Sequence, residues 1–140
     1  MLYCQKFSAV TGRILLGLYF LIPGISKVSG FKATAIYMSE HGMVFIPFFL
    51  VTTIILQIGG GMALILGFRI SEVSFMFAVL TLIISLVMHD FWALESGIEQ
   101  AHEMQNFIKN MAIMAGLLVL SATQHIGTWS LTSSASEANA

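Results

Sequence analysis

Long apolar stretches alternate with short polar connections along the chain. A helix that crosses a membrane needs about 20 mostly apolar residues. Four stretches meet this requirement, at about residues 8–28, 44–67, 71–92 and 106–125. Backbone exposed to lipid must satisfy its own hydrogen bonds, and helices do so within one segment. The pattern therefore predicts an all-α fold, an integral membrane four-helix bundle with up-down-up-down topology.

The two ends of the chain need separate treatment. Residues 1–131 are expected to form a single transmembrane domain, and residues 132–140, rich in Ser and Ala, a disordered C-terminal tail. A secretory signal peptide is an alternative for the first stretch, with Lys6 and Arg13 as its basic region and Ile14–Ile22 as its apolar core. A retained helix is favoured because the stretch is long and its glycines have a packing role.

Small residues recur at helical spacing within the first two stretches. Membrane helices approach one another through small residues, because apolar area drives no association in lipid. Steps of four and three residues give the first helix one such face: Arg13, Gly17, Phe20, Gly24 and Lys27. In the second helix four-residue steps predict the corresponding face: Gly59, Ala63 and Gly67.

Two polar side chains lie inside predicted spans. Arg13 and Lys27 are roughly 21 Å apart along a helix, less than the thickness of the hydrocarbon core. They must therefore either extend to the interface or face protein. Gln57 falls near the middle of the second span, where an amide usually hydrogen-bonds to another helix. We therefore expect Arg13 and Gln57 to be buried polar residues.

Composition and charge agree with a membrane protein. Of 140 residues, 57% are hydrophobic and 9% charged, with a net charge of -1. Soluble domains carry about 25% charged residues, so a soluble enzyme or a disordered regulator is not favoured. A nucleic-acid partner would require a basic patch, which this chain lacks. Cys4 is the only cysteine, which excludes an internal disulfide.

Polar residues gather at one end of the predicted bundle. In an up-down-up-down order the first helix ends on the side where the second begins, the third ends and the fourth begins. This boundary layer is a candidate ligand-binding site, made by Lys27, His89, Asp90, Trp92, Lys109 and Asn110. The opposite layer holds Arg13, Arg69, Glu72, Gln124 and His125.

Four spans place both termini on the same side of the membrane. The positive-inside rule does not separate the two sides, because each carries three lysines or arginines. The acidic residues lie mainly in the third connection and favour cytoplasmic termini, although acids contribute little to orientation.

The motifs of this chain, in their order and spacing, resemble those of the DoxX family of small four-helix membrane proteins. The motifs are Gly12-Arg13 with Leu16-Gly17, Gly60 to Arg69, His89-Asp90-Phe91-Trp92 and Asn106 to Asn110. The resemblance covers about residues 8–123. It implies a bacterial inner membrane protein and an association with quinol oxidase and thiosulfate–quinone chemistry. Many members have a glutamate where this chain has Gln57, and an amide cannot relay protons.

Quinone is the ligand that the polar layer fits best. A quinone needs hydrogen-bonding groups for its head near the membrane surface, with an apolar path for its tail. His89, Asp90, Lys109 and Asn110 supply such groups, and Trp92 supplies a ring for stacking. Haem is not favoured, because bis-His ligation needs two histidines facing one iron. Copper is not favoured either, because methionines in an apolar chain usually serve packing, and no metal site is predicted.

We therefore expect a DoxX-like accessory or redox-associated subunit rather than an enzyme in its own right. Its partners would be the lipid bilayer and either subunits of a membrane redox complex or further copies of the chain. The alternative is a small homo-oligomeric transporter or stress-tolerance membrane protein without a redox partner.

Overall fold

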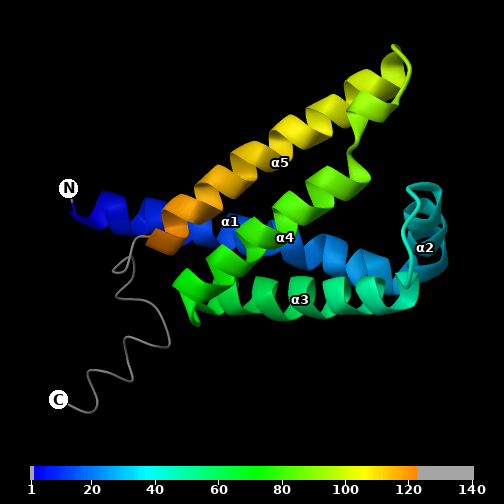
Figure 1. Cartoon of the computed structure of the whole chain (residues 1–140). Helices are drawn as coiled ribbons and strands as arrows, with labels where there is room; N and C mark the ends of the chain where they lie inside the picture. The colour runs from blue at the N-terminus through cyan, green and yellow to red at the C-terminus, as the bar shows by residue number, and fades with distance from the viewer. Residues whose placement is uncertain (1, 123–140) are drawn as a thin grey trace.

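The protein is built from helices. A computed structural model describes residues 2–122, and these residues contain helices and no strand. Figure 1 shows the helices in chain order: α1 (Leu2–Ser29), α2 (Phe31–Glu40), α3 (Ile46–Leu66), α4 (Ile70–Met88), the 3-10 turn η1 (Phe91–Ala93) and α5 (Ile98–Ala122). The all-α prediction is confirmed. The predicted tail at 132–140 lies outside the described residues.

The predicted number of helices is wrong, because α2 was missed and the described residues contain five α-helices. This helix has only ten residues and carries Lys32, Thr34, Ser39 and Glu40. A search for apolar stretches of 20 residues cannot find a helix that is short and polar. α2 connects α1 to α3 and stands at one end of the molecule (Figure 1).

Three helical segments of the described chain are long and apolar enough to cross a membrane. They are Tyr3–Ser29, Ile46–Leu66 and Ile70–Ala93. α5, with 25 residues, is longer than α3 and α4, but its first half carries Glu99, His102, Glu103 and Lys109. A span at residues 106–125 and the up-down-up-down topology stay predictions.

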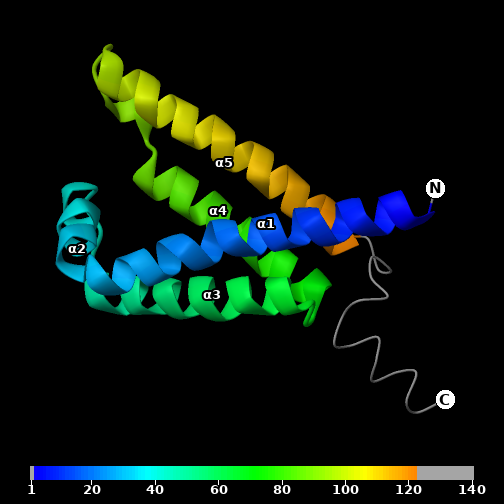
Figure 2. The ribbon, with the colours of Figure 1, turned by 180° about the vertical axis from the view of Figure 1, so that it is seen from behind.

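Glycines let α1 and α3 pack closely, and the two helices lie side by side in both views (Figure 2). A Cβ atom on Gly17 would lie 2.9 Å from the carbonyl oxygen of Gly61, and one on Gly61 would lie 2.9 Å from that of Gly17. A Cβ atom on Gly24 would lie 2.9 Å from Cβ of Gln57. The predicted glycine face of the first helix therefore packs against α3.

The small-residue face predicted for the second helix, Gly59, Ala63 and Gly67, is not the face that α3 packs against α1. A Cβ atom on Gly59 would meet nothing within 4 Å in the described chain. Gly67 ends α3 with a φ of 76°, a conformation that glycine adopts without steric cost. α3 instead presents Gly61 and Gln57 to α1, four residues apart. Spacing of four alone cannot choose between these two faces.

Two helical hairpins meet at an aromatic contact. The ring of Phe20 on α1 stacks on Phe77 of α4, with centroids 3.8 Å apart and planes 7° apart. Leu64 of α3 and Leu117 of α5 are fully buried in the same cluster. A Cβ atom on Gly60 would lie 2.7 Å from Phe77, so this glycine makes room for the ring.

The hairpins diverge away from this contact. α1 and α3 form one hairpin with α2 between them in sequence, and α4 and α5 form the other. Figure 1 shows the α4–α5 hairpin rising away from α1 and α3 towards the end where α2 stands. The open end of the fold is therefore the end where α1 and α4 finish and α5 begins.

The close α1–α3 contact gives a stability prediction. Gly61→Ala forces a methyl group against the backbone of α1, and overpacking of this kind costs about 1–3 kcal/mol. Gly59→Ala on the same helix meets nothing and serves as the matched control. Thermal unfolding in mild detergent should show a lower midpoint for Gly61→Ala only. Equal midpoints for the two variants would contradict this packing.

Candidate functional site

A cleft of about 1010 Å³ lies between the two hairpins. Its walls come from the second halves of α1 and α4, the first half of α3, α2, and the part of α5 near Lys109. Phe20, which stacks on Phe77 in the core, is part of its lining. Cavities that bind small molecules typically measure about 300–1,000 Å³, so this cleft is large enough for a ligand.

Most of the cleft lining is apolar, as membrane-spanning helices require. Leu50, Leu56, Leu80, Ile84 and Val87 supply aliphatic side chains from α3 and α4. These residues come from helical segments that are apolar enough to cross a membrane. A ligand of this cleft must therefore present a largely apolar surface.

Two buried polar atoms interrupt the apolar lining. Gln57 of α3 is 5% exposed and Thr81 of α4 is 3% exposed. Gln57 Oε1 and Thr81 Oγ1 have no hydrogen-bond partner within the described chain. An unsatisfied buried polar group costs about 1–3 kcal/mol. A ligand that hydrogen-bonds to these atoms would recover this cost.

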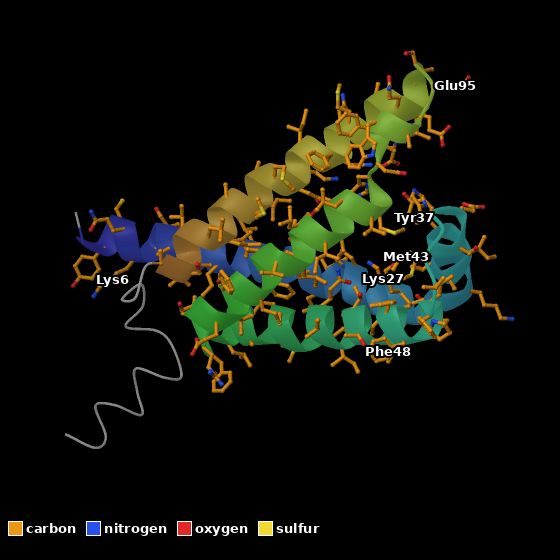
Figure 3. The ribbon with its side chains drawn as sticks, in the orientation of Figure 1. Lys6, Lys27, Tyr37, Met43, Phe48 and Glu95 are labelled. Carbon is orange, nitrogen blue, oxygen red and sulfur yellow. The ribbon has the colours of Figure 1, made fainter. Side chains whose placement is uncertain are left out.

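Four residues of the predicted polar layer line the cleft. They are Lys27 of α1, His89 after α4, and Lys109 and Asn110 of α5. Asn110 is buried, and its Oδ1 accepts a hydrogen bond from Tyr19 Oη at 3.1 Å, which connects α5 to α1. Lys27, Tyr37 and Met43, which all line the cleft, gather at the open end of the fold in Figure 3, far from Lys6.

The other two residues of the predicted layer lie outside the cleft lining. Asp90 Oδ1 is 3.8 Å from His41 Nε2. Trp92 is 56% exposed and packs edge-on against Phe91 and Phe107. Their positions follow from the end of α4 at Met88, after which the chain turns through η1 and leaves the helix axis. Stacking of Trp92 on a ligand in this cleft is therefore not supported.

A hydrogen-bonded chain runs from His89 along α5. His89 Nδ1 lies 2.6 Å from Glu103 Oε2, Asn106 donates to the same oxygen at 3.5 Å, and Lys109 Nζ donates to Asn106 Oδ1 at 3.0 Å. Burial alone would raise the pKa of Glu103. The hydrogen bonds from His89 and Asn106, together with the electrostatic effects of His89 and His102, outweigh burial and hold the pKa below its ordinary value. Glu103 is therefore an acceptor at neutral pH.

The short helix α2 reaches across the open end of the cleft. Tyr37 Oη donates a hydrogen bond to the carbonyl oxygen of Met88 at 3.3 Å, and His41 lies near Asp90. Burial and the carboxylates of Glu103 and Asp90 raise the pKa of Tyr37, so it stays a neutral phenol and a donor. α2 thereby connects the two hairpins at the end where they diverge.

Three residues of this region were not predicted from the sequence. Tyr37 was missed together with α2. Thr81 shares a helix face with Ser74 and Ser85, at steps of seven and four residues, and all three are buried. That polar spacing within an apolar span was the available signal. Glu103 lies in the first turns of α5, before the apolar stretch that begins at about residue 106, and nothing in the sequence pairs it with His89.

The predicted opposite layer is only partly within the described chain. Arg13 is 4% exposed, and its Nη2 donates to the carbonyl oxygen of Ile65 at 3.4 Å. Arg69 and Glu72 form an exposed ion pair at 3.1 Å. Gln124 and His125 lie outside the described residues. Within residues 2–122, no three His, Cys, Asp or Glu side chains come together as a group able to hold a metal ion.

The apolar helices and the cleft between them define a multi-pass helical membrane protein. The DoxX family model matches residues 8–90, and the chain belongs to this family. It is 31% identical to inner membrane protein YqjF of Escherichia coli K12 over 120 residues, 85% of each chain. It is 28% identical to inner membrane protein YphA of the same organism over 111 residues, 79% of each chain. No solved structure matches.

These relatives also fix the location of the protein. Both are inner membrane proteins, and the described chain has several helices able to span a membrane. The protein is therefore a multi-pass protein of the bacterial inner membrane. The side on which the termini lie stays a prediction.

The contact between His89 and Glu103 predicts a pH dependence of stability. The pKa of Glu103 is lower in the folded protein than the ordinary 4.5. Its contribution to stability is therefore present above the unfolded pKa and is lost as the pH falls through the folded value. Glu103→Gln should lower the unfolding midpoint at pH 7 and make little difference at acidic pH.

The exposed Glu99 on the same helix provides the control for this measurement. Glu99→Gln should leave the midpoint unchanged at both pH values. A Glu103→Gln variant that loses equal stability at neutral and acidic pH would show that the carboxylate charge contributes nothing.

Proposed function

We propose that this DoxX-family protein is an accessory, redox-associated membrane subunit that binds quinone or quinol in the cleft between its hairpins. The observation that carries this proposal is the pair of unsatisfied buried atoms, Gln57 Oε1 and Thr81 Oγ1, in an apolar cleft with polar side chains at one end. A quinone combines an apolar ring and tail with oxygen atoms on opposite sides of the ring.

The two buried atoms match the two redox forms of such a ring. Gln57 Oε1 accepts hydrogen bonds, as the hydroxyl group of a quinol requires. The Thr81 hydroxyl also donates, as the carbonyl oxygen of a quinone requires. Lys27 and Lys109 supply further donors to the cleft. The aliphatic residues between these groups suit the ring faces and the tail.

The accessory role rests on the chemistry of the side chains. The chain contains one cysteine, Cys4, so it cannot cycle between a dithiol and a disulfide of its own. We place the component that exchanges electrons with the bound quinol outside this chain, in a membrane partner. Many apolar side chains are exposed on α1, α3 and α4, including Leu15, Ile55 and Leu82. These surfaces suit lipid or the helices of a membrane partner.

Removal of the Thr81 hydroxyl tests the binding site. Thr81→Val keeps the side-chain shape and should weaken binding of decylubiquinone by about three- to tenfold, the value of one hydrogen bond. Ser74→Ala removes a buried hydroxyl outside the cleft lining and should leave the affinity unchanged. Titration of the purified protein in lipid nanodiscs measures both. Wild-type protein that binds no quinone would contradict the proposal.

A second test addresses the redox association in cells. Lys109→Ala removes a donor that lines the cleft and should lower quinol-dependent oxygen consumption of membranes while the amount of protein stays the same. Lys6→Ala, at the far end of α1, is the control (Figure 3). Normal respiration in the Lys109 variant, together with altered solute flux, would instead support a transporter.

A further inference from the structure

His89 occupies a position between the cleft and the polar connection after α4. It is the C-terminal cap residue of α4 and is part of the cleft lining. Its Nδ1 lies 2.6 Å from Glu103 Oε2, and both side chains are 17% exposed. His89 therefore borders the cleft and also contacts Glu103, a residue of α5 that is not part of the cleft lining.

Glu103 determines which nitrogen of His89 remains for a ligand. An ionised carboxylate only accepts hydrogen bonds, so Nδ1 must carry the hydrogen atom in this contact. Nε2 is then the ring nitrogen that can change its state. It offers a lone pair when the ring is neutral and an N–H group when the ring is protonated. One atom can thus act as acceptor or donor without any movement of the side chain.

The charges around His89 come from four elements or connections. α3 contains no titratable side chain. Of the titratable groups on the remaining elements, those that line the cleft are Tyr19 and Lys27 on α1, Tyr37 on α2 and Lys109 on α5. Those beside its polar end are Glu40 and His41 at the end of α2, Asp90 after α4, and Glu99, His102 and Glu103 on α5. Asp90 is near His41, and Lys109 donates to Asn106. Glu103 is the carboxylate in direct contact with His89.

We infer that His89 is the proton-exchanging residue of the cleft and matches its protonation state to the redox state of the bound ligand. The inference rests on the proposed function and adds a linkage between ligand and proton. A quinone carbonyl oxygen accepts a hydrogen bond, so it binds better to the protonated ring. A quinol hydroxyl donates one, so it binds better to the neutral ring with its lone pair at Nε2.

Binding of the two ligands should therefore change the number of protons on the protein in opposite directions. Binding of quinone draws a proton from solution onto His89, and binding of quinol returns one to solution. Each exchange involves up to one proton per site. The affinity for quinone then falls as the pH rises and the affinity for quinol increases. The dissociation constant for quinone divided by that for quinol should therefore rise with pH, by up to about tenfold per pH unit.

Calorimetry on the full chain in lipid nanodiscs measures this exchange directly. Decylubiquinone and decylubiquinol are each titrated near pH 6.5, where histidine side chains ordinarily titrate, in two buffers that differ in ionisation enthalpy. The buffer dependence of the heat gives the number of protons exchanged. We expect uptake with the quinone and release with the quinol.

Variants assign the proton to His89. His89→Asn keeps a side-chain N–H group able to reach Glu103 but removes the imidazole ring, and should abolish proton exchange while both ligands still bind. His89→Gln serves as the second variant if the first does not fold. His102→Asn, on the exposed side of α5 one residue from Glu103, should exchange protons as the wild type does.

The outcomes separate this inference from the proposed function. Wild-type protein that binds both ligands without proton exchange, or with the same sign for both, overturns the inference and leaves the binding site standing. Exchange that persists in both His89 variants, or disappears in the His102 variant, overturns the assignment to His89. Failure of wild-type protein to bind either ligand removes the proposed function and the inference with it.

Discussion

The stacking of Phe20 on Phe77 joins the two helical hairpins of the protein. It depends on Gly60, because any side chain at that position would occupy the space of the Phe77 ring. The hairpins are close together at this contact and diverge beyond it (Figure 1). The cleft is lined by the second halves of α1 and α4 and therefore lies towards the ends of these helices. The cleft thus forms because the core around Phe20 and Phe77 joins the two hairpins at one level and leaves them apart beyond it.

Much of the architecture could be predicted from the sequence because lipid imposes strong rules. The apolar stretches identified the helical class, and the spacing of Gly17 and Gly24 identified the face of α1 that packs on α3. The face of α3 could not be chosen, since Gly59, Gly60 and Gly61 are consecutive and only the three-dimensional register selects Gly61. α2 could not be found by a criterion based on apolar length.

The candidate site was predicted only in part, for a related reason. The order of helix ends predicts which residues share one level of the bundle but carries no information about rotation around each helix. Lys27 and Asn110 both line the cleft, whereas Asp90 and Trp92 at the same level do not. The contact between His89 and Glu103 joins residues fourteen positions apart across a turn whose geometry has no sequence signature.

The length of α1 has a consequence for how the protein sits in a bilayer. Its 28 residues extend about 42 Å, whereas the hydrocarbon core is about 30 Å thick. α3, with 21 residues, extends about 32 Å and matches that thickness. If α3 fits the bilayer, the first turns of α1 project into the headgroup region, where Tyr3 and Phe7 are exposed. This mismatch would anchor one end of the hairpin and set the depth of the cleft within the opposite leaflet.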